Sequence, residues 1–222
     1  MNPDICLVKI EEPLDDRTAN FLMKFSPPEK QSRILRQRIK RIADTMIVGG
    51  ALARHMLWKH FSIPPNAQIS YGKFGKPYLS DFPQCHFNIS HSGQYVVCAV
   101  YNAPIGVDIQ QIVPYRSDVA IRVFSPAELR QIENSSDPSA EFTRLWTRME
   151  ARIKALGIGI GQAPACDTSF SYKTDTCFLE DAFVSVSYNF HDSAFNTIIN
   201  LVENQEFSRL ISRSFHGKII II

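Results

Sequence analysis

Two short segments of this chain repeat each other at a separation of 99 residues. "FSPPE" occupies residues 25–29, and "FSPAE" occupies residues 124–128. Each predicts a helix start, with Ser as the N-cap, Pro at the first helical position and Glu placed to complete a capping box. At the same separation, the helical pattern of residues 42–57 matches that of residues 141–156. The chain is therefore expected to contain two similar units.

In both units these helices are followed by segments in which apolar and polar residues alternate, as they do in half-buried strands. They read "AQISYG", "HFNISHS" and "QYVVCAVY" in the first, and "DTSFSY", "AFVSVSYNF" and "AFNTIINLV" in the second. We predict an α+β fold of two similar, pseudo-twofold-related halves, residues 1–103 and 104–222. Each half is expected to be a small antiparallel sheet with helices packed on one face. A cleft between such halves is a natural place for a functional site.

Composition narrows the class of protein. The 222 residues are 45% hydrophobic and 21% charged, which is typical of a globular chain. The sequence predicts neither a membrane span nor a secretory signal. Five cysteines without a CxxC pair favour reduced thiols in the cytoplasm and argue against a zinc site. A net charge of +2 disfavours a general nucleic-acid binder.

Positive charge is concentrated in one segment. Residues 24–42 hold seven basic residues and a single acid, Glu29. Such a cluster forms a solvated helix face, or it contacts phosphates or an acidic protein partner. The segment by itself leaves these alternatives open.

Two segments place polar side chains at strands. In "GVDIQ", residues 106–110, Asp108 interrupts an apolar strand, where a carboxylate is costly unless it is paired or binds a metal. The alternative is a carboxylate that caps the next turn. In "FNISHSG", residues 87–93, Ser90 and His91 suit an oxyanion or a phosphate, although a plain polar turn explains them as well.

Two further segments carry lysines. "YGKFGKPYL", residues 71–79, is a predicted turn with Lys73 and Lys76, and it lacks the Walker phosphate-loop pattern. "LWTRMEARIKALGIG", residues 145–159, places Glu150 four residues before Lys154. That spacing is typical of an ordinary helical ion pair. The alternative is an acid that binds a metal beside a lysine that binds a phosphate, and this stretch alone favours the ordinary pair.

Taken in order, these segments, together with "SPPEK" and Arg33, resemble the Sfp-type 4'-phosphopantetheinyl transferases. The matching pieces span residues 26–159, and the rest of the chain matches only in general character. The resemblance implies a pseudo-twofold pair of α+β halves. It also implies Mg2+-dependent transfer of the phosphopantetheine arm of coenzyme A to a serine of a carrier protein, with release of 3',5'-ADP.

The resemblance also assigns roles to residues of this chain. Asp108 and Glu150 would be magnesium ligands, with Glu150 a candidate base acting through water, and Lys154 would contact the pyrophosphate. Trp146 would anchor the packing of that helix. The remaining expected coenzyme contacts are Lys30 and Arg33 at the 3'-phosphate, and Lys76, Pro77, Ser90 and His91 around the adenosine and the pyrophosphate.

Three positions depart from the family pattern. Gln110 stands where a second acid is usual, and would offer the metal a neutral oxygen. Met149 replaces a lysine that precedes the glutamate, and Arg148 points about 100° away on a helix, so it is no simple substitute. Thr45 replaces a basic residue.

These departures keep two alternatives open. One is a coenzyme A-binding relative without transfer activity, and the other is a nucleic-acid-binding module that uses the basic segment. The leading expectation is a cytoplasmic monomer that acts on an acyl, peptidyl or polyketide carrier, without a nucleic acid or a membrane. The four isoleucines at residues 219–222 predict a last strand that needs a partner or a cover.

Overall fold

The computed structural model describes residues 2–162, 172–189 and 219–221. Before residue 103 the elements are β1 (Asp4–Ile10), α1 (Asp16–Met23), α2 (Pro28–Leu35), α3 (Lys40–Phe61), β2 (Ile69–Tyr71), β3 (Pro77–Leu79), β4 (His86–Ser92) and β5 (Tyr95–Tyr101). After it come β6 (Ile105–Gln111), α4 (Ser117–Val123), α5 (Pro126–Glu133), α6 (Pro138–Leu156), the short 3-10 helix η1 (Ile160–Gln162), β7 (Tyr172–Leu179), β8 (Ala182–Asn189) and β9 (Ile219–Ile221).

The two halves repeat one topology. The series β1, α1, α2, α3, β4, β5 corresponds to β6, α4, α5, α6, β7, β8. In each half the first strand pairs antiparallel with the last, and the last with the one before it, which gives the strand orders β4-β5-β1 and β7-β8-β6. The predicted α+β fold of two similar halves is therefore confirmed.

The division at residue 103 stays a prediction, and the end of the chain crosses it. Strand β9 pairs antiparallel with β1, so the predicted last strand exists and extends the sheet of the first half. Of the other predicted strands, "AFNTIINLV" lies outside the described residues, as does "DTSFSY" except for Tyr172.

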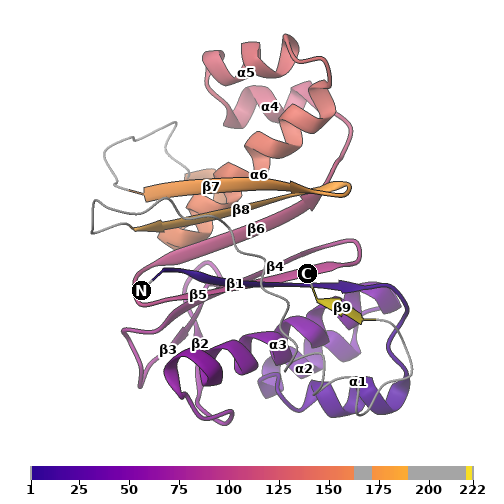
Figure 1. The fold of residues 1–222 in the computed structure, drawn as a ribbon, viewed down its shortest axis with the longest axis vertical. Coiled ribbons are helices and arrows are strands. Elements are labelled where there is room, and N and C mark those ends of the chain that lie inside the picture. Colours follow the sequence, from indigo (N-terminus) through magenta and orange to yellow (C-terminus); the bar gives the residue numbers. More distant parts are fainter. Residues whose placement is uncertain (1, 163–171, 190–218, 222) are drawn as a thin grey trace.

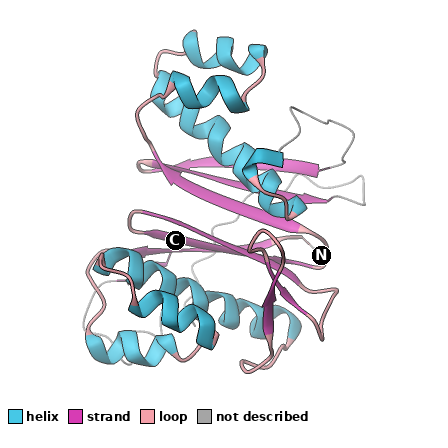
Figure 2. Cartoon of the chain, turned by 180° about the vertical axis from the view of Figure 1, so that it is seen from behind, coloured by secondary structure: helices cyan, strands magenta, loops and turns pink. Residues whose placement is uncertain are grey.

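The molecule is layered, with helices outside and the two main sheets facing each other (Figure 1). Helices α1–α3 cover the outer face of the first sheet, where Val8 and Val96 join their core. The neighbouring residues Leu7 and Val97 face the other way, into a core shared with the second sheet. Because both faces of the first sheet are covered, β1 and β5 are almost continuously apolar instead of alternating. Figure 2 shows α6 lying across the second sheet.

The repeated helix starts differ by one residue. At α5 the predicted capping box forms, with the Ser125 hydroxyl accepting from the Glu128 amide and the Glu128 carboxylate accepting from the Ser125 amide. At α2 the prediction of a Ser26 cap is wrong: the N-cap is Pro27. A residue before proline favours extended backbone, and Pro28 follows Pro27, so this helix begins one residue later. The Ser26 side chain is buried instead, against Gly50 of α3.

Candidate active site

Strand β6 places Asp108 between the two halves. Its neighbours Val107 and Ile109 point into the core between the sheets, so strand alternation turns Asp108 toward α6. The strand crosses the helix closely at Gly106, where a Cβ would lie 2.1 Å from the Ala151 carbonyl oxygen. Only a glycine fits this crossing. Asp108, the next residue of β6 on the side that faces the helix, therefore lies at the last turns of α6.

Asp108 is buried and paired. Its Oδ1 accepts hydrogen bonds from the Ser90 hydroxyl at 2.7 Å and from the Lys154 ammonium at 2.5 Å. The ammonium also donates to the Ser90 hydroxyl oxygen at 3.0 Å. Strand β4, strand β6 and helix α6 each contribute one side chain to this cluster. Asp108 therefore does not act as a simple turn cap.

Glu150 lies one turn before Lys154 on α6, yet Lys154 forms its ion pair with Asp108, 46 residues away. The ordinary helical pair expected from the spacing is absent from the ion pairs of the described residues. Burial raises the pKa of Glu150; Lys154 lowers it and Asp108 raises it. The carboxylates of Asp108 and Glu150 therefore both lie near the Lys154 ammonium, in a partly buried site.

Gln110 lies two residues beyond Asp108 and faces the same side of β6. Its amide nitrogen donates to the Ser92 hydroxyl at 3.1 Å and to the Gln111 carbonyl oxygen at 3.2 Å. These bonds hold the amide by its nitrogen, which leaves the amide oxygen available to a ligand. The described residues contain no group of three or more His, Cys, Asp or Glu side chains that would hold a metal unaided.

A cavity of about 480 Å³ lies in the first half. Ile89 and His91 of β4 line it, whereas the intervening Ser90 faces Asp108 on the other side of the strand. The predicted site residues among its lining are Lys30 and Arg33 of α2, Pro77 of β3 and His91 of β4. Burial and the charge of Arg33 lower the pKa of Lys30. Burial, followed by the charges of Lys30 and Lys154, lowers the pKa of His91. Lys30 and Arg33 outnumber Glu29, the one acid of the lining, so the cavity carries net positive charge. His91 is the sequence neighbour of Ser90, which belongs to the Asp108 cluster.

The Lys76 side chain points toward the end of α6 and not into the cavity, although it was expected to contact the coenzyme. Its ammonium donates to the carbonyl oxygen of Ala155 at 2.6 Å, at the end of α6. Burial lowers its pKa to about 8. The turn that holds it, between β2 and β3, therefore touches the second half of the molecule. Its neighbours Gly75 and Pro77 line the cavity, while Lys76 itself does not.

The three departures have distinct surroundings. Met149 packs with the apolar cluster of α4–α6, the same cluster that Trp146 joins, so Trp146 is a packing residue as predicted. Arg148 donates to the Thr174 carbonyl and the Thr176 hydroxyl of β7, and so does not replace the missing lysine. Thr45 is buried in the cavity wall, with its hydroxyl bonded to the Ile42 carbonyl at 2.9 Å.

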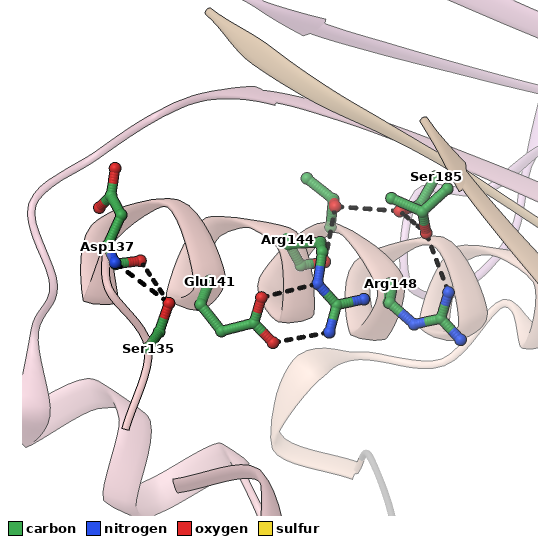
Figure 3. A network of polar contacts seen from close by, with 8 residues as sticks. Ser135, Asp137, Glu141, Arg144, Arg148 and Ser185 are labelled. Carbon is green, nitrogen blue, oxygen red and sulfur yellow. Dashed lines mark hydrogen bonds and ion pairs between the residues drawn. The ribbon is translucent and has the colours of Figure 1, made fainter. Parts of the chain in front are cut away.

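A polar network that the sequence does not predict fixes α6 on the second sheet (Figure 3). The Ser185 hydroxyl of β8 contacts the hydroxyls of Thr147 and Thr176, each at 2.9 Å. Arg148 extends this chain of contacts, and toward the helix start Arg144 pairs with Glu141 at 2.7 Å. Isolated Ser and Thr residues at strand and helix positions give no signal of such a network. It lies beside Asp108 on the same face of the second sheet, because Ser185 is the cross-strand partner of Asp108.

The sequence also missed part of the cavity wall. Gln37, Tyr71 and the glycine pair Gly49–Gly50 line it with the predicted residues. The glycine pair within a long helix was the available signal, because such a pair in a helix interior points to close packing.

Comparison with known proteins identifies the family. Residues 104–208 match the 4'-phosphopantetheinyl transferase superfamily, and residues 13–103 match the family described as 4'-phosphopantetheinyl transferase, N-terminal. A 4'-phosphopantetheinyl transferase of Bacillus subtilis is 36% identical over 157 residues, covering 69% of this chain and 70% of the relative. The chain belongs to the 4'-phosphopantetheinyl transferase superfamily, as the motifs predicted.

Two other relatives extend the comparison. The 4'-phosphopantetheinyl transferase Sfp of Bacillus subtilis strain 168 is 31% identical over 156 residues, covering 69% of this chain and 70% of Sfp. The L-aminoadipate-semialdehyde dehydrogenase-phosphopantetheinyl transferase of Mus musculus is 28% identical over 156 residues, covering 63% of this chain and 50% of the relative.

Proposed function

We propose that this protein transfers the 4'-phosphopantetheine arm of coenzyme A to a serine of an apo carrier protein and releases 3',5'-ADP. The observation that carries the proposal is that strand β4 contributes side chains to two features. One is the cluster of Asp108, Lys154 and Ser90, and the other is the cavity lined by Lys30 and Arg33. Phosphoryl transfer requires positive charge for the phosphates, and oxygen ligands for a metal where one takes part.

Mg2+ fits the oxygen atoms that meet here. It binds through one or two carboxylates and completes its shell with phosphate oxygens and water. Asp108 and Glu150 would hold it, with the Gln110 amide oxygen as a neutral third ligand. When bound, Mg2+ supplies charge stabilisation to the pyrophosphate. A site with only two carboxylates depends on the substrate phosphates for the rest of the coordination, which agrees with the donors present.

We assign different basic side chains to the different phosphate groups of coenzyme A. Lys30 and Arg33 line the cavity, and we assign them to the 3'-phosphate of coenzyme A. His91 and Pro77 line the same cavity and would contact the adenosine, together with Ser90. Lys154, which contacts Asp108 and Ser90, would stabilise the negative charge that develops on the departing 3',5'-ADP. We assign Lys76 to the pyrophosphate end, where it would exchange the Ala155 carbonyl for a phosphate oxygen.

Glu150 is the candidate base. Burial raises its pKa, and a carboxylate of raised pKa accepts a proton more readily than an ordinary glutamate. We propose that it removes the proton of the carrier serine through a water molecule. The hydroxyl oxygen then attacks the phosphorus nearer to pantetheine, and the bond from that phosphorus to the bridging oxygen breaks.

We further propose a cytoplasmic monomer that acts on an acyl, peptidyl or polyketide carrier without a nucleic acid or a membrane. Both halves of the candidate site come from one chain. The four described cysteines are free. Among the described residues no helix is both long and apolar enough to cross a bilayer.

Intact-mass spectrometry of an apo carrier protein tests the proposal. The carrier is incubated with this protein, coenzyme A and Mg2+. We expect the carrier to gain one phosphopantetheine, and the gain to disappear when the metal is chelated. If several carriers gain no mass while coenzyme A still binds, the protein is the coenzyme-binding relative without transfer activity. If coenzyme A does not bind either, the proposal is wrong.

A further inference from the structure

The ammonium of Lys154 lies where it competes with a cation. Asp108 Oδ1 accepts two hydrogen bonds, one from the Lys154 ammonium at 2.5 Å and one from the Ser90 hydroxyl at 2.7 Å. The Asp108 side chain is 8% exposed and that of Lys154 is 28% exposed, so water screens this pair incompletely. The negative charge of Asp108 is therefore compensated by an ion pair with a residue of its own site.

A divalent cation on the same carboxylate would stand within a few ångströms of the ammonium. Repulsion between neighbouring positive charges is strong where solvent is partly excluded. Glu150 relieves it only in part, because its one carboxylate leaves two negative charges against the three positive charges of the ammonium and the cation. Ser90 strengthens the pairing, because its hydroxyl accepts from Lys154 and donates to Asp108, which holds the two groups together.

We propose that Lys154 masks Asp108 until a phosphate of coenzyme A draws the ammonium away, so that the metal binds well only with or after the coenzyme. The inference rests on the proposed function for the identity of the coenzyme. It gives Lys154 a second role, in which the residue that serves the leaving phosphate also sets the order of binding. Because coupling between ligands is reciprocal, the metal in turn tightens the coenzyme.

Titration with Mn2+ alone tests the masking, because Mn2+ takes the same carboxylate, carbonyl and water ligands as Mg2+ and free Mn2+ is measured by electron paramagnetic resonance. The protein is titrated without coenzyme A and without a carrier. We expect Lys154→Gln to bind Mn2+ on the order of tenfold more tightly than the unaltered protein, the size typical of a close charge pair. Lys154→Met, which removes the hydrogen bonds as well, should show the same direction.

Two controls make the result specific. Lys40→Met also removes the ammonium from a buried aspartate, since Lys40 pairs with Asp44 at 2.8 Å and the Asp44 side chain is 1% exposed. It should leave the Mn2+ affinity unchanged. Adding Asp108→Asn to Lys154→Gln should cancel the gain.

Equal or weaker Mn2+ binding in both Lys154 variants overturns the masking, as does an equal gain in Lys40→Met. Thermal denaturation of each variant shows that it is folded, and Lys154→Gln, which keeps a hydrogen-bond donor, remains available if Lys154→Met unfolds. The carrier-loading assay tests the proposed function separately from the masking. Carrier loading with unchanged Mn2+ affinities removes the masking alone, whereas a gain in Mn2+ affinity without loading removes the transfer reaction alone.

Discussion

Gly106 of β6 and Ala151 of α6 approach each other more closely than any side chain would allow. A Cβ on Gly106 would lie 2.1 Å from the Ala151 carbonyl oxygen and 2.2 Å from the Ala155 amide nitrogen. Both obstacles are backbone atoms of one helix, so neither can move without displacing α6. The contact sets the distance between the strand that carries Asp108 and the helix that carries Glu150 and Lys154.

Gly106→Ala should therefore separate the strand from the helix. Overpacking of this kind costs about 1–3 kcal/mol of the free energy of unfolding, and rigid backbone obstacles place this change at the upper end. We expect a lower melting temperature and a loss of carrier loading larger than the loss of folded protein explains. Gly161→Ala is the matched control, because a Cβ there has no neighbour within 4 Å. A Gly106→Ala variant as stable and active as Gly161→Ala would refute the close-contact argument.

Glu150→Gln tests the assignment of metal ligand and base. The substitution keeps the size of the side chain and removes its charge, and Glu150 is only part-buried on α6, so the fold should persist. We expect carrier loading to fall on the order of 10²-fold or more, because a general base alone contributes that much. Glu141→Gln, on the same helix but in the ion pair with Arg144, should keep nearly full activity. If Glu150→Gln loads carrier at the rate of the unaltered protein, Glu150 has neither role.

Lys30→Ala combined with Arg33→Ala tests the assignment of the 3'-phosphate. Both residues line the cavity, away from the Asp108 cluster, so they should bind ground state and transition state alike. We expect KM for coenzyme A to rise roughly 10- to 100-fold, the value of a hydrogen bond to a charged group, with little change in kcat. Arg36→Ala is the control, because Arg36 is the exposed C-cap residue of α2 and its Nε donates to the Ser32 carbonyl. An unchanged KM in the double variant would exclude the assignment.

Much of this fold follows from local patterns. The repeat of "FSPPE" and "FSPAE" predicts two similar halves, and the shared strand order agrees. The pattern of residues 141–156 predicts the helix that carries Glu150 and Lys154, and apolar neighbours predict that Asp108 is buried. These features depend on periodicity or capping within one element, which a sequence displays directly.

What the sequence could not predict depends on how elements meet. The spacing of Glu150 and Lys154 suggests a helical pair, but the tertiary contact with Asp108 prevails because β6 crosses α6 at Gly106. Likewise the sequence indicates only a positively charged turn at Lys76, and the family resemblance adds the coenzyme role. The structure shows a contact that neither predicts, from the Lys76 ammonium to the Ala155 carbonyl oxygen near the helix end. Unpaired carbonyls at a helix C-terminus attract cations, so this contact satisfies two groups that the sequence shows separately.

The lowered pKa of Lys76 makes coenzyme binding depend on pH. Burial lowers this pKa to about 8, so in the free protein Lys76 is charged below that pH and progressively neutral above it. A bound phosphate favours the charged form, so the pKa is higher in the complex and binding takes up a proton above pH 8. The affinity for coenzyme A should therefore fall as the pH rises from about 8 toward the pKa of the complex.

Calorimetric titration of coenzyme A between pH 7 and pH 9.5 measures this dependence. Lys76→Met removes the titrating group, so its affinity should be lower than that of the unaltered protein at pH 7 and nearly independent of pH across the alkaline range. Lys73→Met, on the same turn but over the exposed Phe74 ring, should keep the unaltered profile. A profile in Lys76→Met that falls as steeply as in the unaltered protein would show that another group titrates, and that Lys76 keeps its bond to Ala155 when the coenzyme binds.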